Sequence, residues 1–211
     1  MSYLLFYSPG TASLAVHWML IELGVPFEAE TIDIKAERSA AYLALNPAGR
    51  VPTLVVDGAP VSESAALLML LAERHPEGGF APAVGAPGRA AWMEAMLLLA
   101  NGLSPAMRDW FYADKDGDPV GAEAVQALAR RRIEGMFERL DGMLADGRPY
   151  LLGEAVTTAD FLATMLMRWS RNMARPATSW PHLEAYVTRM RARPAFAEVC
   201  RREGLTEWLN G

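Results

Sequence analysis

The sequence changes character on the two sides of a stretch rich in glycine and proline, HPEGGFAPAVGAPG, at residues 75–88. Before this stretch, short apolar runs alternate with helical patterns; after it, the apolar residues recur only at helical spacing. Glycine and proline interrupt regular structure, so we expect a linker here. This change in apolar pattern across the linker favours two domains: an α/β part at residues 1–75 and an all-helical part at residues 89–211, joined by residues 76–88.

The first part is expected to fold as βαβ followed by ββα. The apolar run YLLFY at residues 3–7 predicts a buried strand, and residues 13–23 predict a helix that ends at Gly24. The Asp57-Gly58 pair between two strand patterns predicts a hairpin turn. The other expected elements are a strand at 27–34, a short helix at 38–45, strands at 53–57 and 59–62, and a helix at 63–74.

The second part is expected to be a helical bundle. Gly102 and Pro105 predict a kink in the first helix. Thr157 and Asp160 have the spacing of a capping box, which is a structural signal for the start of a nearly all-apolar core helix. The expected helices are at 89–113, 122–145, 157–171, 181–191 and 195–203.

Composition excludes several classes of function. The formal net charge is −5 and the basic residues are dispersed, so no nucleic-acid partner is expected. The single cysteine and three widely spaced histidines exclude a disulfide framework and predict no metal site. No signal-peptide or membrane-spanning pattern is found, so we expect a cytoplasmic protein with no membrane partner.

The turn that begins the first helix, SPGTAS, contains hydroxyl residues and no charge. Thr11 and Ser13 stand directly before an almost wholly apolar run. Two interpretations are open: the hydroxyls cap the helix, or they face a negatively charged group that binds there.

Two further motifs have both a structural and a functional interpretation. Val51-Pro52 precedes a strand; a trans proline would simply open the strand, whereas a cis bond would leave the Val51 backbone free to pair with an extended ligand. At the start of the next helix, either Ser62 or Ser64 simply caps the helix, or Glu63-Ser64 holds an amino-acid zwitterion, with Glu63 on the ammonium group and Ser64 on the carboxylate.

Taken together, these motifs resemble the cytosolic glutathione S-transferases over essentially the whole chain. The residues that carry the resemblance are SPGTASLAVHWMLIELGVPFE, NPAGRVPTL, SES and TTAD. The resemblance implies a thioredoxin-like first domain that binds glutathione as co-substrate. It also implies a cis Val51-Pro52 bond with the Val51 backbone on the cysteinyl part, Glu63 and Ser64 on the γ-glutamyl end, and Arg50 near the glycyl end.

The turn is most similar to that of the bacterial beta-type enzymes, but Ala12 replaces their catalytic-position cysteine. This replacement argues against mixed-disulfide chemistry at that position. The resemblance implies that hydroxyls activate the thiol of glutathione instead, with Ser13 and Thr11 as the first candidates and the strand-end Tyr7 as the next.

The helical domain departs from the beta-type pattern. Ala100-Asn101 stands where those relatives have a His-Lys pair. Nearby, Arg108, Trp110 and Tyr112 are candidates for an electrophile pocket; the alternative for these aromatic residues is core packing.

The expected function is conjugation of the glutathione thiolate to a small apolar electrophile, a detoxification reaction, in a homodimer. The alternatives are other glutathione-dependent chemistry, such as peroxide reduction, dehalogenation or isomerisation, and a binding protein of the same fold without catalysis.

Overall fold

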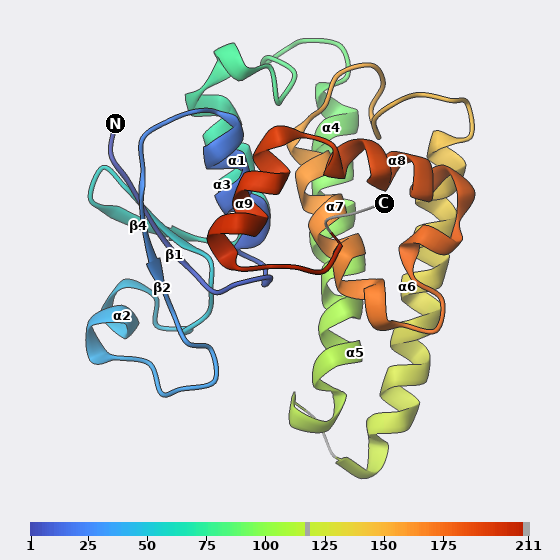
Figure 1. Cartoon of the computed structure of the whole chain (residues 1–211), viewed down its shortest axis with the longest axis horizontal. Coiled ribbons are helices and arrows are strands. Elements are labelled where there is room, and N and C mark those ends of the chain that lie inside the picture. Colours follow the sequence, from blue (N-terminus) through green and yellow to red (C-terminus); the bar gives the residue numbers. More distant parts are fainter. Residues whose placement is uncertain (117–118, 209–211) are drawn as a thin grey trace. The chain divides into compact units, whose positions relative to one another are not determined.

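A computed structural model of the chain describes residues 1–116 and 119–208. They form two compact units (Figure 1). Unit 1 holds residues 1–81 together with the C-terminal segment from residue 191, and unit 2 holds residues 82–190. The first boundary falls inside the expected linker. The C-terminal segment was expected with the helical part, but its helix packs in unit 1.

Unit 1 is built on a four-stranded mixed sheet in the order β2–β1–β3–β4. β1 pairs in parallel with β2 and antiparallel with β3, and β3 pairs antiparallel with β4. The parallel pair confirms the predicted βαβ unit, and the remaining pairs confirm the ββα half. The strands are β1 (Tyr3–Tyr7), β2 (Glu28–Thr31), β3 (Thr53–Val56) and β4 (Ala59–Ser62).

The register of this sheet brings three chain segments to one edge. Thr53, the first residue of β3, is opposite Phe6 on one side and Ser62 on the other. The turn after β1, the residues before β3 and the residues after β4 therefore all leave the sheet at the same edge. These are the segments that carry the candidate motifs.

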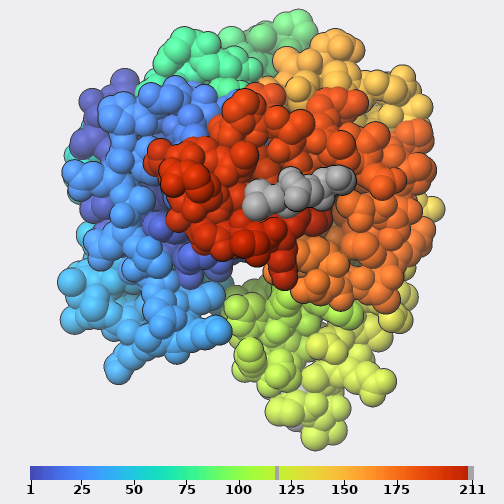
Figure 2. Space-filling view, viewed as in Figure 1, coloured from blue at the N-terminus to red at the C-terminus, as the bar shows by residue number. Residues whose placement is uncertain are grey.

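The helices of unit 1 surround the sheet. α1 (Leu14–Glu22) has seven consecutive buried residues, Leu14 to Leu20, because it contacts β1, α3 and α9. The Trp18 ring meets the Phe196 ring edge-on at 4.9 Å between centroids. Figure 2 shows the red C-terminal residues against the blue N-terminal ones of this unit. The other helices are α2 (Ala40–Leu45), α3 (Ser64–Arg74) and α9 (Pro194–Glu203).

The regular elements of unit 2 in the described part of the chain are helices, joined by connecting segments of which the one at residues 145–157 carries an isolated bridge. The predicted kink is a π-helical turn, Leu99–Leu103, between α4 and α5. α7 is the central helix, with eleven of its residues buried, and the Asp160 carboxylate accepts the Thr157 N–H at its start as the capping box predicts. The helices are α4 (Arg89–Leu98), α5 (Ser104–Asp116), α6 (Ala122–Leu144), α7 (Thr158–Trp169) and α8 (Pro181–Arg191).

Candidate functional site

The turn between β1 and α1 holds two interlocked hydroxyls. Ser13 Oγ accepts a hydrogen bond from the Ser8 N–H and donates to the Ser8 carbonyl, both at 3.1 Å. Thr11 Oγ1 donates to the same carbonyl at 2.7 Å and lies 3.0 Å from Ser13 Oγ. The Ser13 side chain makes no capping bond to α1, so its hydrogen bonds lie within the turn. Ser13 is fully buried and Thr11 is partly exposed, so Thr11 is the hydroxyl that a ligand can reach.

A carboxylate from the far end of the chain supports this turn. Glu203, on α9, accepts a hydrogen bond from the Gly10 N–H at 2.7 Å and contacts His17 Nδ1 at 2.8 Å. Both Glu203 and His17 are buried. Glu203 therefore holds both the turn and the first helix, a role that the sequence analysis did not predict.

The Val51–Pro52 peptide bond is cis, as the resemblance implied. Pro52 is buried and Val51 is partly exposed. Neither the N–H nor the C=O of Val51 hydrogen-bonds to another residue within 1–116 or 119–208. The ladder of β3 begins two residues later, so Val51 offers an open pairing position beside the sheet edge.

The start of α3 lies beside the same turn. Glu63 is exposed and has a positive φ of 74°, a conformation that non-glycine residues adopt rarely. Ser64 Oγ donates to the Ala12 carbonyl at 2.8 Å. This bond ties the N-terminus of α3 to the β1–α1 turn, so the first N–H groups of the helix lie near residues 11–13.

The two remaining candidates of unit 1 lie at its surface. Tyr7, the last residue of β1, is partly exposed, and its ring is 4.8 Å from the His17 ring. The Arg50 side chain is exposed, while its carbonyl is held by two buried side chains. The structure thus places the turn, Val51-Pro52 and Glu63-Ser64 at one edge of one sheet.

The candidates of unit 2 lie on α5. The Arg108 guanidinium lies 4.8 Å from the Tyr112 ring centroid and pairs with Asp116 at 2.5 Å. Trp110 lies about 200° round the helix from Arg108, so it does not share a face with the Arg108–Tyr112 pair. Tyr112 itself has non-helical backbone angles, which bend α5 at this point.

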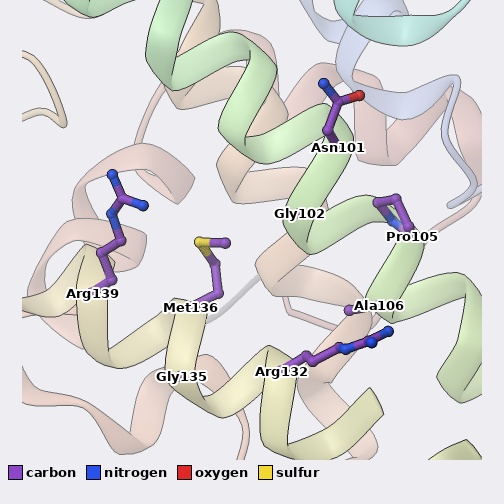
Figure 3. Close-up of a pocket in the computed structure, with 8 residues that line it drawn as sticks. All are labelled: Asn101, Gly102, Pro105, Ala106, Arg132, Gly135, Met136 and Arg139. Atoms are coloured by element: carbon purple, nitrogen blue, oxygen red, sulfur yellow. The ribbon is translucent and has the colours of Figure 1, made fainter. Parts of the chain in front are cut away.

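A groove of about 400 Å³ runs between α5 and α6 in unit 2 (Figure 3). Arg132 and Arg139 of α6 flank Met136, and Met136 Cε would lie 2.8 Å from a Cβ added at Gly102. Gly102 therefore permits the close approach of the two helices at this point. The lining residues are Asn101, Gly102, Pro105, Ala106, Arg132, Gly135, Met136 and Arg139.

Between residues 1–116 and 119–208, no three His, Cys, Asp or Glu side chains are grouped as a metal site. Within the same part of the chain, no helix has both the length and the apolar character needed to cross a membrane.

Comparison with known proteins places this architecture in a family. Residues 11–74 match the N-terminal domain of glutathione S-transferases, and residues 102–194 match the C-terminal domain. A glutathione S-transferase of Xanthomonas campestris is 30% identical over 205 residues, which cover 95% of this chain and 98% of that protein. A probable maleylacetoacetate isomerase of Caenorhabditis elegans is 36% identical over 194 residues, covering 90% and 88%.

Similar solved structures support the same family assignment. A sphingomonad glutathione S-transferase complexed with glutathione superposes with a TM-score of 0.85 at 31% identity, covering 96% of this chain and all of the other. The beta class enzyme of Sphingomonas chungbukensis has the same TM-score at 28% identity and the same coverage. The chain therefore belongs to the glutathione S-transferase family and is similar to its bacterial beta class, with alanine at position 12.

Proposed function

We propose that this protein conjugates the thiolate of glutathione to a small apolar electrophile. The observation that carries the proposal is the edge of the unit 1 sheet. There the hydroxyl-bearing turn, the open backbone of Val51 beside a cis proline, and the N-terminus of α3 come together. Glutathione is the co-substrate, and no metal takes part.

Glutathione fits this edge as an extended tripeptide. Its cysteinyl part pairs with the N–H and C=O of Val51, next to Pro52. Its γ-glutamyl end lies at the N-terminus of α3, where Ser64 meets the carboxylate and Glu63 meets the ammonium group. Its glycyl carboxylate lies near the exposed guanidinium of Arg50. Residues 1–75 thus supply the whole glutathione site.

The hydroxyls of the turn stabilise the thiolate. A free thiol has a pKa of ~8.5, and lowering it by about two units takes roughly 2.7 kcal/mol. A hydrogen bond to a charged group contributes ~1.5–3 kcal/mol, and a helix N-terminus adds about 0.3–1 kcal/mol. The partly exposed Thr11 donates to the sulfur by turning its hydroxyl proton away from the Ser8 carbonyl, and the buried Ser13 holds Thr11 in place. Tyr7 is the next candidate donor.

The electrophile is bound by residues 89–211. The Arg108 guanidinium stacked on the Tyr112 ring offers a flat, partly apolar surface, and Trp110 remains a candidate for the same pocket from its own face of α5. Thiolate stabilisation and proximity then accelerate attack on the electrophile. We assign the protein a role in detoxification and a cytoplasmic location.

Isomerisation is the second candidate reaction, because one relative is a probable maleylacetoacetate isomerase. The same glutathione site serves peroxide reduction and dehalogenation. A glutathione-binding protein without catalysis is the alternative of a different class, and Ala12 is the residue that favours it, since the cysteine of beta-type enzymes is missing.

Calorimetry of glutathione binding, followed by a turnover assay with a panel of electrophiles, tests the proposal. Thr11→Ala is expected to lower turnover by one to two orders of magnitude, because the thiolate loses a hydrogen bond of roughly 1.5–3 kcal/mol. Glutathione affinity should change by less than threefold. Glu63→Ala/Ser64→Ala should instead weaken binding at least tenfold. Wild-type protein that binds no glutathione would contradict the proposal, and binding without turnover would favour the non-catalytic alternative.

The protein is further proposed to act as a homodimer, as the family resemblance implies. In unit 2, Met93 and Leu97 are large apolar side chains that are 43% and 52% exposed on α4. A second copy of the chain would cover this exposed apolar pair of α4.

A further inference from the structure

Side chains hold the backbone immediately before Val51, although residues 49 and 50 belong to no helix or strand. Arg38 Nε donates to the Gly49 carbonyl at 2.9 Å. The next carbonyl, that of Arg50, accepts two hydrogen bonds, from Tyr42 Oη at 2.6 Å and from Asn46 Nδ2 at 2.9 Å. The chain is therefore held immediately before Val51, whose own N–H and C=O stay open.

The same two side chains also hold the residue after the proline. Thr53 Oγ1 lies 2.9 Å from Tyr42 Oη and 2.9 Å from Asn46 Nδ2. Asn46 Oδ1 accepts the Ala48 N–H at 3.1 Å, which identifies its other terminal atom as the amide nitrogen. Tyr42 and Asn46 thus clamp both ends of the segment that contains the Val51–Pro52 bond.

One arrangement of protons satisfies every bond in this cluster. Tyr42 has a single hydroxyl proton, which it donates to the Arg50 carbonyl, so Thr53 donates its own proton to Tyr42 Oη. Asn46 has two amide protons, one for the Arg50 carbonyl and one for Thr53 Oγ1. No donor is left over, and a closed network of this kind fixes a single geometry.

Burial makes the cluster rigid. Tyr42, Asn46 and Thr53 are 3%, 6% and 1% exposed, and the Tyr42 ring packs against Phe6 of β1 at 5.2 Å between centroids. Water does not reach these buried groups to replace a lost hydrogen-bond partner. Rearranging the cluster would therefore cost free energy. The rigid sheet and the open position of Val51 are therefore linked through Tyr42.

We infer that Tyr42 and Asn46 are positioning residues for glutathione: through the Arg50 carbonyl and the Thr53 hydroxyl, they hold the Val51 backbone in the orientation that pairs with the cysteinyl part. The inference rests on the proposed function. Neither side chain touches the thiol, so their loss weakens binding without changing the chemistry of the sulfur. The expected signature is a higher KM for glutathione with kcat nearly unchanged.

The test compares two tyrosines of unit 1. Tyr42→Phe keeps the ring against Phe6 but removes one donor from the Arg50 carbonyl and the acceptor of the Thr53 proton. The matched control is Tyr3→Phe, since Tyr3 is also buried and its hydroxyl also has two partners, His75 Nε2 at 2.8 Å and Met1 Sδ at 3.7 Å. We expect the Kd of glutathione to rise five- to tenfold in Tyr42→Phe and less than twofold in Tyr3→Phe. Binding is measured at a temperature well below the melting temperature of both variants.

A second variant tests the other side of the cluster, and a second ligand tests which part of glutathione is affected. Thr53→Val removes the hydroxyl from the other side of the cluster, and it should raise the Kd in the same direction, with an effect that does not add to that of Tyr42→Phe. The dipeptide γ-glutamylcysteine lacks the glycyl end. It should lose affinity by the same factor as glutathione, because the Val51 contact lies on the cysteinyl part. Loss for glutathione alone would overturn the inference and assign the effect to the Arg50 side chain.

The outcomes separate the two proposals. If wild-type protein binds glutathione and Tyr42→Phe binds as tightly as Tyr3→Phe, the inference is overturned and the proposed function stands. If the wild-type protein does not bind glutathione, the proposed function is overturned, and the inference with it.

Discussion

At the scale of single residues, the buried carboxylate at the start of α7 is the shared acceptor of several buried donors. Asp160 is fully buried and accepts hydrogen bonds from the N–H of Leu151 (3.0 Å), the N–H and hydroxyl of Thr157 (2.7 and 3.1 Å) and the hydroxyl of Tyr186 (3.0 Å). It joins a loop, a helix start and a second helix of unit 2. The capping interpretation made from the sequence therefore describes only one of its bonds.

Asp160→Ala is expected to destabilise the protein by at least about 3 kcal/mol, because four buried donors lose their acceptor at about 1–3 kcal/mol each. Urea unfolding measures the change. The control is Asp141→Ala: Asp141 also accepts two backbone N–H groups, those of His182 and Leu183, but in a more exposed position. Its loss should cost about 1 kcal/mol. Equal losses in the two variants would show that burial does not set the cost.

At the scale of elements, α9 has two different faces. Its inner face carries Phe196, which packs on α1, and Glu203, which holds the β1–α1 turn. Its outer face carries Glu198, which accepts hydrogen bonds from Arg201 and Arg202. These two guanidiniums lower the pKa of Glu198 from 4.5 to about 2.

This lowered pKa predicts a dependence on pH. A carboxyl group whose pKa is lower in the folded state stabilises the fold above its unfolded pKa, and that contribution disappears as the pH falls from about 4.5 towards 2. The pair is exposed, so its effect on stability is small. NMR titration of Glu198 should show the low pKa in the wild type and a value nearer 4.5 in Arg201→Gln/Arg202→Gln. Arg189→Gln should leave it unchanged; an ordinary wild-type value would refute the pairing.

At the scale of the whole molecule, the exposed apolar residues of α4 are candidates for the homodimer interface. Met93 and Leu97 are one helical turn apart, so they lie on the same face of α4. Isolated apolar side chains at a surface are normal, but here a groove lined by Pro105 and Met136 occurs in the same unit. A second chain that covers this face would remove these side chains from water.

Leu97→Glu is expected to shift the protein from a dimer of twice 23.1 kDa towards the monomer, because a charge at the interface must lose its water on association. Sedimentation or light scattering measures the mass. Val84→Glu is the control, since Val84 is 85% exposed outside the helices and should not affect assembly. A monomeric wild type would contradict the dimer, and an unaffected Leu97→Glu dimer would place the interface elsewhere.

Much of the fold was predictable because its signals are local. Asp57-Gly58 predicted a hairpin, and the structure has positive φ at both residues, 50° and 88°. Gly24, predicted to end the first helix, has a φ of 65°. Such turns depend on residues within a few positions of one another, so the sequence itself contains the cause. The cis Val51–Pro52 bond is different: local statistics favour trans, and only the family resemblance predicted it.

By itself, the sequence determined the order of strands and helices and the motifs that meet at one edge of the unit 1 sheet, but it placed α9 with the helical part, whereas α9 packs in unit 1. Only the tertiary structure decided which hydroxyl is accessible, since Ser13 is buried and Thr11 is not. It also decided that Glu203 reaches Gly10, 193 residues away in the chain. Periodicity indicates which side chains are buried, whereas their partners depend on how distant elements pack, and that information appears only when the chain has folded.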